Sequence, residues 1–144
     1  MASEMHTSII LRLVEEVFNQ GNLAAVDTVY APVFTLNDLP TGIEDFKQAI
    51  TMLHATFPGF HVTTDDLVTA GDMVAATWTI HTRPLAAEPR EALTAREMAW
   101  TGVHVFRITG GKIVEEWLNW DALNQLQQVD PLFMPQLPAG YHSN

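Results

Sequence analysis

The segment from Gly102 to Asp121, GVHVFRITGGKIVEEWLNWD, constrains the fold of this chain more than any other. Two runs rich in β-branched and aromatic residues flank a glycine pair, an arrangement that predicts a β-hairpin. Pairing of the two strands would gather several chemically useful side chains near one end of the hairpin: His104, Trp117, Trp120 and Asp121. The segment therefore predicts a strand pair and a candidate site together.

Upstream of this hairpin, the hydrophobic pattern is helical. Apolar residues recur on one face over Glu4–Gln20 and again over Ile43–Thr56, which predicts two helices. Gly21 is expected to end the first helix, and Asn22 to cap a shorter helix that runs to about Tyr30.

Extended segments account for most of the remainder. A short strand is expected over Val33–Asn37, followed by a turn-rich loop over Asp38–Gly42. Longer strands are predicted over Phe60–Thr69, Asp72–Arg83, Leu93–Ile108 and Lys112–Trp120. Pro84–Arg90 is expected to be an irregular loop, and Asp121–Gln128 a short helix capped by Asp121 itself.

Helices followed by long antiparallel strands predict an α+β fold with one sheet. We expect N-terminal helices packed on a curved, mostly antiparallel sheet, forming a cone with an apolar pocket that suits a small molecule. The chain has 144 residues, of which 47% are hydrophobic, and is expected to form a single domain over residues 1–144.

Composition and charge argue against several classes of function. The chain has no cysteine, which excludes disulfides and thiolate chemistry, and His54, His61 and His81 lack ligand spacing, so no metal is expected. Asp65 and Asp66 are adjacent in a strand and are expected to point to opposite faces. A formal charge of -10 with seven scattered basic residues argues against nucleic acid as a partner.

The N-terminal stretch has no basic region followed by a long apolar run, and no apolar stretch is long enough to span a bilayer. We therefore expect a cytoplasmic protein with no membrane partner.

The register of the closing hairpin decides which side chains share a face, because a slip of one residue exchanges the faces. If the loop consists of Gly110 and Gly111 alone, His104 lies opposite Trp117. If the loop begins one residue earlier, His104 faces Glu116. Both loops are compatible with the glycine pair, and we favour the longer one.

The longer loop is favoured because it collects one plausible pocket wall: Trp100, Gly102, His104, Phe106, Ile108, Leu118 and Trp120. The other face then holds Val103, Val105, Ile113 and Trp117. Both faces are substantially apolar, so both should be covered, the second one by another subunit in a homodimer.

Three stretches, in this order and spacing, resemble SnoaL-like polyketide cyclases of the nuclear transport factor 2-like cone-fold superfamily. They are LPTGIEDFKQAI, ATFPGFHVTTDDLVTAGDMVAATWTIHTR and GVHVFRITGGKIVEEWLNWDALNQLQQ. Members of this family close rings of polyketide esters by intramolecular aldol reaction. The resemblance implies that no metal or organic cofactor is used.

The resemblance also implies a carboxylate that acts as acid/base, assisted by a pocket histidine that His104 matches. The family's aspartate after Glu-x-Trp is replaced here by Leu118, whereas a second aspartate is retained as Asp121. The family's histidine near the first strand is replaced by Asn37, and its Pro-Thr-Gly-Arg motif survives only as Leu-Thr-Ala-Arg at residues 93–96.

Aldol closure needs a base that removes a proton next to a carbonyl, and a carboxylate in an apolar pocket can serve. Leucine cannot, so Asp121, Glu116 or His104 would take that role. Each has a structural alternative: Asp121 as a helix cap, Glu116 as a solvated strand carboxylate, and His104 as a hydrogen-bonded core residue.

The leading hypothesis is cofactor-free acid/base chemistry, of cyclase or isomerase type, on a hydrophobic carbonyl compound. His104 would polarise the carbonyl, and Asp121 or Glu116 would exchange the proton. The pocket is expected to be lined by Trp100, Leu118, Trp120, Phe34, Asn37, Leu53 and Phe57.

Two other hypotheses remain open. The first is a ligand-binding or structural dimer of the same fold that has lost catalysis through Leu118. The second is a hydrolase or dehydratase, since the cone superfamily includes epoxide hydrolases and scytalone dehydratase. That activity needs a buried aspartate beside an arginine or histidine, and the sequence does not place Arg96 or Arg107 beside Asp121.

Overall fold

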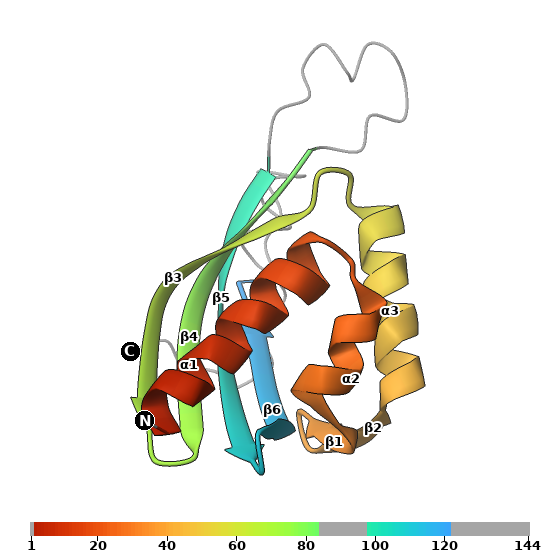
Figure 1. The fold of residues 1–144 in the computed structure, drawn as a ribbon. Coiled ribbons are helices and arrows are strands. Elements are labelled where there is room, and N and C mark those ends of the chain that lie inside the picture. Colours follow the sequence, from red (N-terminus) through yellow and green to blue (C-terminus); the bar gives the residue numbers. More distant parts are fainter. Residues whose placement is uncertain (1, 84–97, 122–144) are drawn as a thin grey trace, which may run out of the picture.

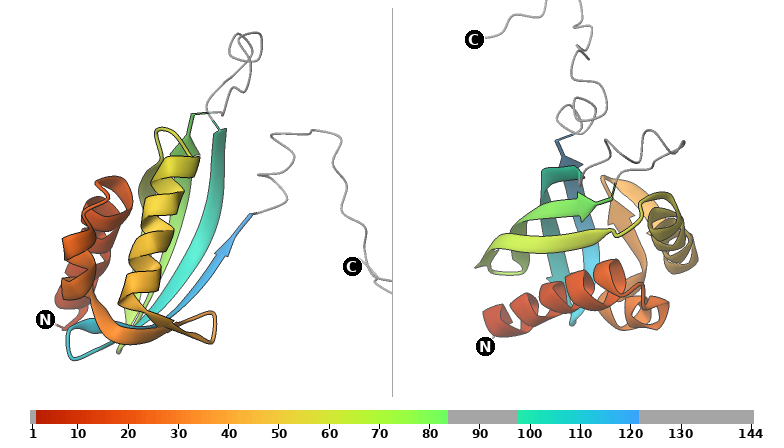
Figure 2. Two further views of the ribbon diagram at one scale, coloured as in Figure 1. Left: turned by 90° about the vertical axis from the view of Figure 1, so that its right-hand side faces the viewer. Right: turned by 90° about the horizontal axis from the view of Figure 1, so that it is seen from above.

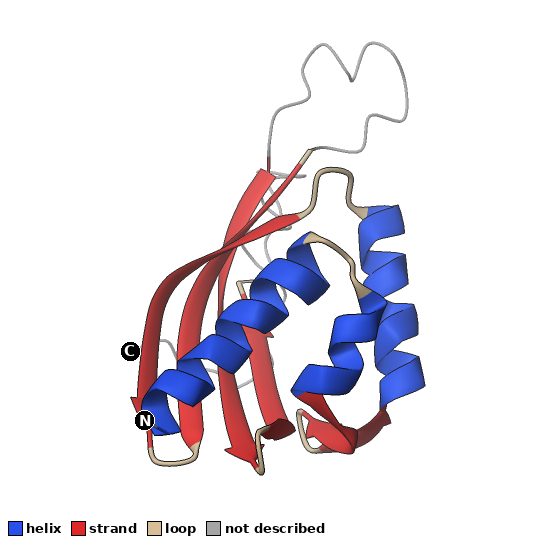
Figure 3. Ribbon diagram, viewed as in Figure 1, coloured by secondary structure: helices blue, strands red, loops and turns tan. Residues whose placement is uncertain are grey.

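A computed structural model describes residues 2–83 and 98–121 of the chain. Three helices cover one face of a curved six-stranded sheet (Figures 1 and 3). Figure 2 shows that the sheet bends around these helices, so that the space between the two layers narrows toward one end. This architecture confirms the predicted α+β class. No helix in these two ranges is long and apolar enough to cross a membrane.

The helices lie close to their predicted positions. The elements are α1 (Ala2–Arg12), its π-helical continuation η1 (Leu13–Asn19), the 3-10 turn η2 (Leu23–Ala25), α2 (Val26–Val29) and α3 (Ile43–Thr56). Gly21 ends the first helix with a φ of 69°, a left-handed value that glycine adopts without strain. Asn22 lies at the predicted N-cap position of η2, where its carbonyl accepts the Ala25 N–H, but its side chain makes no capping hydrogen bond.

Six strands form one sheet: β1 (Tyr30–Leu36), β2 (Leu39–Gly42), β3 (His61–Ala70), β4 (Met73–Thr82), β5 (Met98–Thr109) and β6 (Lys112–Trp120). Their order is β2-β1-β6-β5-β4-β3. All neighbours are antiparallel except β1 and β6, which run parallel and join the N-terminal half of the chain to the closing hairpin.

The loop predicted over residues 38–42 is wrong, because Leu39–Gly42 pairs with β1 as the strand β2. Asn37 and Asp38 form the two-residue turn between them, with φ values of 50° and 68°. Hairpin turns of this length favour left-handed central residues, and Asn and Asp tolerate them best after glycine. β1 also begins earlier than predicted, at Tyr30, where the sequence favoured a helix end.

Three further predictions fall wholly or partly outside the described residues. They are the loop over Pro84–Arg90, the strand residues before Met98 and the helix over Asp121–Gln128, of which only Asp121 is described.

The closing hairpin combines a two-residue turn with a β-bulge, and neither predicted register contained both. Thr109 pairs with Lys112 across the glycine pair, so the favoured longer loop is wrong. Val114 is then left without a partner in the ladder, and the register shifts by one residue. His104 consequently lies opposite Leu118 rather than opposite either predicted partner.

The bulge also decides which side chains of β6 face the helices. Leu118 and Trp120 share a face with His104, as the favoured grouping had it. Ile113 was predicted to lie on the other face. It is fully buried and packs in the core with Ile108. The bulge at Val114 interrupts the alternation of the strand, so Ile113 shares a face with Glu116 and Leu118 beyond the bulge.

Most of the buried apolar residues fall into two groups. The first, which we call the packed cluster, consists of Ile10, Leu13, Val17, Ala25, Val26, Val29, Tyr30, Phe34, Phe46, Ile50, Val74, Phe106, Ile108 and Ile113. The second, which we call the cavity cluster, consists of Phe60, Val62, Trp78, Ile80 and Trp100.

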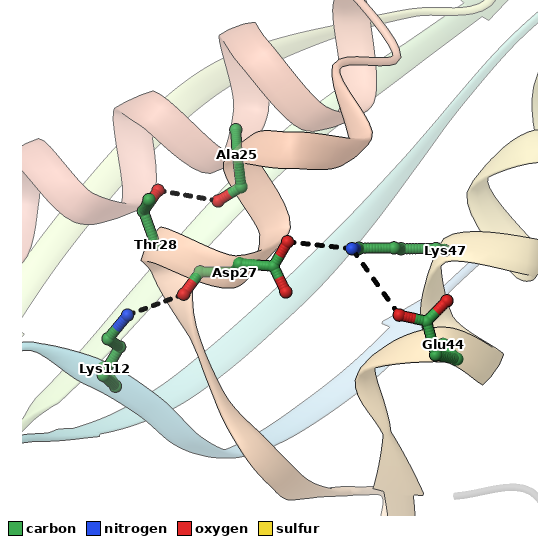
Figure 4. A network of polar contacts seen from close by, with 6 residues as sticks. All are labelled: Ala25, Asp27, Thr28, Glu44, Lys47 and Lys112. Carbon is green, nitrogen blue, oxygen red and sulfur yellow. Dashed lines mark hydrogen bonds and ion pairs between the residues drawn. The ribbon is translucent and has the colours of Figure 1, made fainter.

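A polar network on the surface joins α2 to α3 and β6 (Figure 4). Lys47 Nζ lies 2.8 Å from Asp27 Oδ2 and 3.7 Å from Glu44 Oε1, while Lys112 Nζ donates to the Asp27 carbonyl at 2.6 Å. Exposed ion pairs of this kind add little stability. We therefore expect the packed cluster, rather than this network, to supply most of the stability of this end of the molecule.

Candidate functional site

An apolar cavity of about 160 Å³ lies between the helices and the concave face of the sheet. The first helix, α3 and the segment after α3 contribute Ile10, Leu13, Val14, Phe18, Leu53, Phe57 and Phe60 to its wall. The sheet contributes Val62, Ala76, Trp78, Ile80, Trp100, His104, Phe106, Leu118 and Trp120. His104 is the one titratable side chain among these residues.

Five residues predicted for the pocket line this cavity: Trp100, Leu118, Trp120, Leu53 and Phe57. Phe34 does not line it. Its side chain lies in the packed cluster at 1% exposure, because β1 pairs irregularly with β6 before Thr35 and carries Phe34 against Phe46.

Asn37 does not line the cavity either, but it holds the strand that does. Its side-chain Oδ1 accepts the backbone N–H of Leu118 at 2.9 Å, and its own N–H donates to the Glu116 carbonyl at 2.9 Å. The turn between β1 and β2 is thereby clamped onto β6 beside the cavity.

Glu116 is buried beside the cavity, at 1% exposure, and is not the solvated carboxylate of the structural alternative. Its Oε2 lies 2.7 Å from His104 Nε2 and accepts the hydroxyl of Tyr30 at 2.9 Å. The His104 ring also stacks on Phe106, with centroids 4.0 Å apart and planes inclined by 28°. The imidazole is therefore fixed by a carboxylate at one edge and by an aromatic ring on one face.

The phenol of Tyr30 acts as a donor in this arrangement. Burial raises its pKa well above the usual tyrosine value, and the negative charge and hydrogen bond of Glu116 raise it further. Buried polar groups need hydrogen-bond partners, and Tyr30 and His104 both lie within hydrogen-bond distance of Glu116 Oε2. Sequence reasoning missed Tyr30 because it was placed at the end of a helix.

Asp121 is not brought to the cavity. It is exposed, its backbone N–H donates to the Thr101 carbonyl at 2.9 Å, and it borders a shallow hollow together with Val103 and Asn119. These neighbours alternate with His104 and Leu118 along their strands, so the hollow lies on the outer face of the sheet. The structure thus separates Asp121 from His104 by the thickness of the sheet.

The prediction for Asp65 and Asp66 is wrong, because both point to the outer face. Asp65 accepts the Thr79 hydroxyl at 2.6 Å, and Asp66 accepts that of Thr77 at 3.3 Å. A bulge after Thr64 makes this possible, since it interrupts the alternation of the strand. In the described parts of the chain, no group of three or more His, Asp or Glu side chains could hold a metal ion.

A cone of helices and curved sheet around an apolar cavity defines the nuclear transport factor 2-like fold. A profile of the SnoaL-like polyketide cyclase family matches residues 8–129. The chain therefore belongs to the SnoaL-like polyketide cyclase family.

Solved structures agree with this assignment. A protein from Acidithiobacillus ferrooxidans is 21% identical with a TM-score of 0.75, covering 88% of this chain and 95% of its own. IdmH from Streptomyces antibioticus is 26% identical with a TM-score of 0.72, covering 85% and 96%. A SnoaL-like polyketide cyclase from Agrobacterium tumefaciens is 16% identical with a TM-score of 0.73, covering 85% and 96%. No curated protein matches the chain.

Proposed function

We propose that the cavity binds an uncharged, apolar carbonyl compound and that the protein performs cofactor-free acid/base chemistry on it, of polyketide cyclase or isomerase type. The observation that carries this proposal is the position of His104. Its imidazole forms part of the wall of an apolar cavity and is held at 2.7 Å by the buried carboxylate of Glu116. A carboxylate that orients a histidine is a recurring arrangement for general-base catalysis.

In this proposal His104 transfers the proton, a role that the sequence favoured for a carboxylate, and Glu116 orients the imidazole. Glu116 holds the Nε2–H of His104, and the Nδ1 lone pair is then available to remove a proton next to the substrate carbonyl. In an aldol closure, the resulting enolate carbon forms a bond with a second carbonyl carbon of the same molecule. The imidazolium, stabilised by Glu116, returns its proton to the new alkoxide oxygen.

The cavity limits what this site would accept. Its volume of about 160 Å³ is close to the roughly 150 Å³ of an apolar cavity known to hold one benzene ring. One ring or an equivalent chain would be enclosed, and a larger substrate would extend through the mouth. Among the cavity-lining residues that the structure describes there is no lysine or arginine, so an anionic substrate group would find no cationic partner among them.

Deuterium incorporation into a simple ketone tests the proposed proton transfer. Acetophenone in D2O would be followed by NMR, with wild-type protein, His104→Gln and the exposed-histidine control His61→Gln. We expect the wild type and the control to accelerate exchange of the methyl protons, and His104→Gln to return the rate to that of buffer. Binding of acetophenone without accelerated exchange would overturn the catalytic proposal.

That contrary result would favour the second candidate, a binding protein without catalysis. The observation in its favour is Leu118, which lines the cavity directly opposite His104 at the position of the family's aspartate. Leu118→Asp would place a carboxylate beside the imidazole. If the wild type only binds ketones and this variant exchanges their protons, the missing aspartate accounts for the lost chemistry.

A homodimer formed through the outer face of the sheet is a further part of the proposal. Val68 and Val103 are 64% and 46% exposed on that face, and their strands are joined through β4. Burial of such side chains against a second copy would be favourable. We expect the wild type to sediment as a dimer and Val103→Asp as a monomer, and a monomeric wild type would refute it.

A further inference from the structure

Tyr30 lies outside the cavity but is connected to it through one atom. Its ring is 1% exposed and packs between Phe34 and Phe46, with centroid distances of 4.3 and 4.6 Å. Its hydroxyl donates to Glu116 Oε2 at 2.9 Å, and the same oxygen lies 2.7 Å from His104 Nε2. The packed cluster therefore extends one polar group toward the candidate site.

We infer that Tyr30 is a positioning residue, which keeps Glu116 as an anion and thereby holds the proton of neutral His104 on Nε2, leaving Nδ1 for the cavity. This inference rests on the role proposed above for His104. It assigns a function to a side chain that touches neither the cavity nor any ligand in it.

The alternative protonation state shows why a second donor matters. A buried Glu116 that took up a proton would donate from its own O–H to His104 Nε2, and the imidazole proton would then move to Nδ1. The nitrogen available to a ligand would change from an acceptor to a donor. Hydrogen bonds to a carboxylate favour its charged form, so the phenol opposes this change.

The phenol of Tyr30 is suited to this role because it donates a hydrogen bond to Glu116 and does not become an anion that would compete for the same donors. Its raised pKa keeps the proton on the oxygen, so it donates to Glu116 and does not compete for the proton. Within residues 2–83 and 98–121, Glu116 forms an ion pair with His104 and with no lysine or arginine. The Tyr30 hydroxyl is accordingly the second donor that the carboxylate has in this part of the chain.

The backbone fixes the distance between the two residues. Tyr30 is the first residue of β1 and pairs with Ile113 on β6, the strand that carries Glu116. The aromatic neighbours of Tyr30 hold its ring in place, so little side-chain freedom is lost when the hydrogen bond forms. The bond is thus preorganised by the parallel strand pair and by the packed cluster.

Nitrogen-15 NMR of histidine-labelled, ligand-free protein tests the inference. At a pH where His104 is neutral, we expect the wild type to carry its proton on Nε2. In Tyr30→Phe, which keeps the ring, we expect the Nδ1–H form to increase about tenfold, the effect of losing one hydrogen bond to a charged group. An unchanged tautomer ratio in Tyr30→Phe would overturn the inference.

A matched variant separates this effect from packing. Phe46→Leu disturbs the same aromatic group without removing a hydrogen bond from Glu116, and we expect it to leave the tautomer ratio unchanged. An equal shift in both variants would assign the effect to packing and refute the positioning role. The measurement needs no substrate, so its result is independent of whether the wild type exchanges ketone protons.

Discussion

The packed cluster and the cavity cluster are both rich in aromatic residues, but the first is filled and the second encloses a cavity. In the packed cluster, Tyr30, Phe34 and Phe46 contact one another, and none is more than 7% exposed. Trp100 of the cavity cluster packs against Phe57, with ring centroids 5.8 Å apart, but both rings also border the cavity. The comparison teaches that the same aromatic side chains can fill one region and enclose a space in the other, and that Glu116 marks the boundary between the two.

Truncation of a phenylalanine in each region gives the largest expected difference. Phe34→Ala should lower the free energy of unfolding by about 3–5 kcal/mol, because it opens a hole in a filled core. Phe57→Ala should cost only about 1–2 kcal/mol, because its half-buried ring already borders a cavity and only burial is lost. Urea unfolding of both variants measures the two losses, and equal values would abolish the distinction between the regions.

A side chain added at Gly102 tests how freely the cavity wall can yield. A Cβ there would lie 2.2 Å from Cη2 of Trp78, so the indole would have to move. We expect Gly102→Ala to cost about 1–3 kcal/mol and to weaken acetophenone binding, because overpacking displaces neighbouring side chains. Gly42→Ala is the control, since a Cβ there meets nothing within 4 Å. Unchanged stability and binding in Gly102→Ala would contradict this expectation, because the Trp78 indole would then move without cost.

Alkaline pH should destabilise the packed side of the boundary through Tyr30. Its pKa is raised in the folded protein, chiefly by burial, so above about pH 10 the unfolded chain loses a proton that the folded chain keeps. The free energy of unfolding should therefore fall with rising pH by up to about 1.4 kcal/mol per unit, and be constant from this source below pH 10. Tyr30→Phe should show a shallower decline in chemical unfolding, and identical slopes would contradict the assignment.

The surface network of Figure 4 should give the smallest effect of all. Lys47→Ala removes the contacts with Asp27 and Glu44, and the carboxylates of both acidic residues are well exposed. We expect a slight fall in the thermal midpoint at low salt that vanishes at high salt, because solvent and ions already screen these charges. A loss comparable to that of Phe34→Ala would mean that the network, rather than the packed cluster, stabilises this end.

Local patterns in the sequence predicted much of the fold. The helix over Ile43–Thr56 depends on local spacing and is as predicted. The glycine pair correctly marked the position of the last turn, but the favoured loop was one residue too long. Asn37 and Asp38 are a suitable pair for a two-residue turn, but the turn was not predicted, because Asn37 was placed at the end of the strand over Val33–Asn37.

The site was harder to predict because it depends on contacts distant in sequence. Nothing in the residues around Val114 signals a bulge, yet the bulge sets the partner of His104. The bond from Tyr30 to Glu116 spans 86 residues and depends on a parallel strand pair that no local pattern specifies. The one available signal was parity, since Glu116 lies two residues before Leu118 in the strand and therefore shares the face assigned to the pocket.

The unpaired Val114 has a consequence for anyone who would redesign this protein. Its deletion would leave the other pairs of the hairpin as they are, because Ile113 would stay opposite Ile108 and Glu116 opposite Phe106. Straightening the strand while keeping Val114 would instead slip every later residue by one position and turn Glu116 to the face opposite His104. A redesign can therefore remove the extra residue or keep the bulge, but it cannot keep the residue without the bulge.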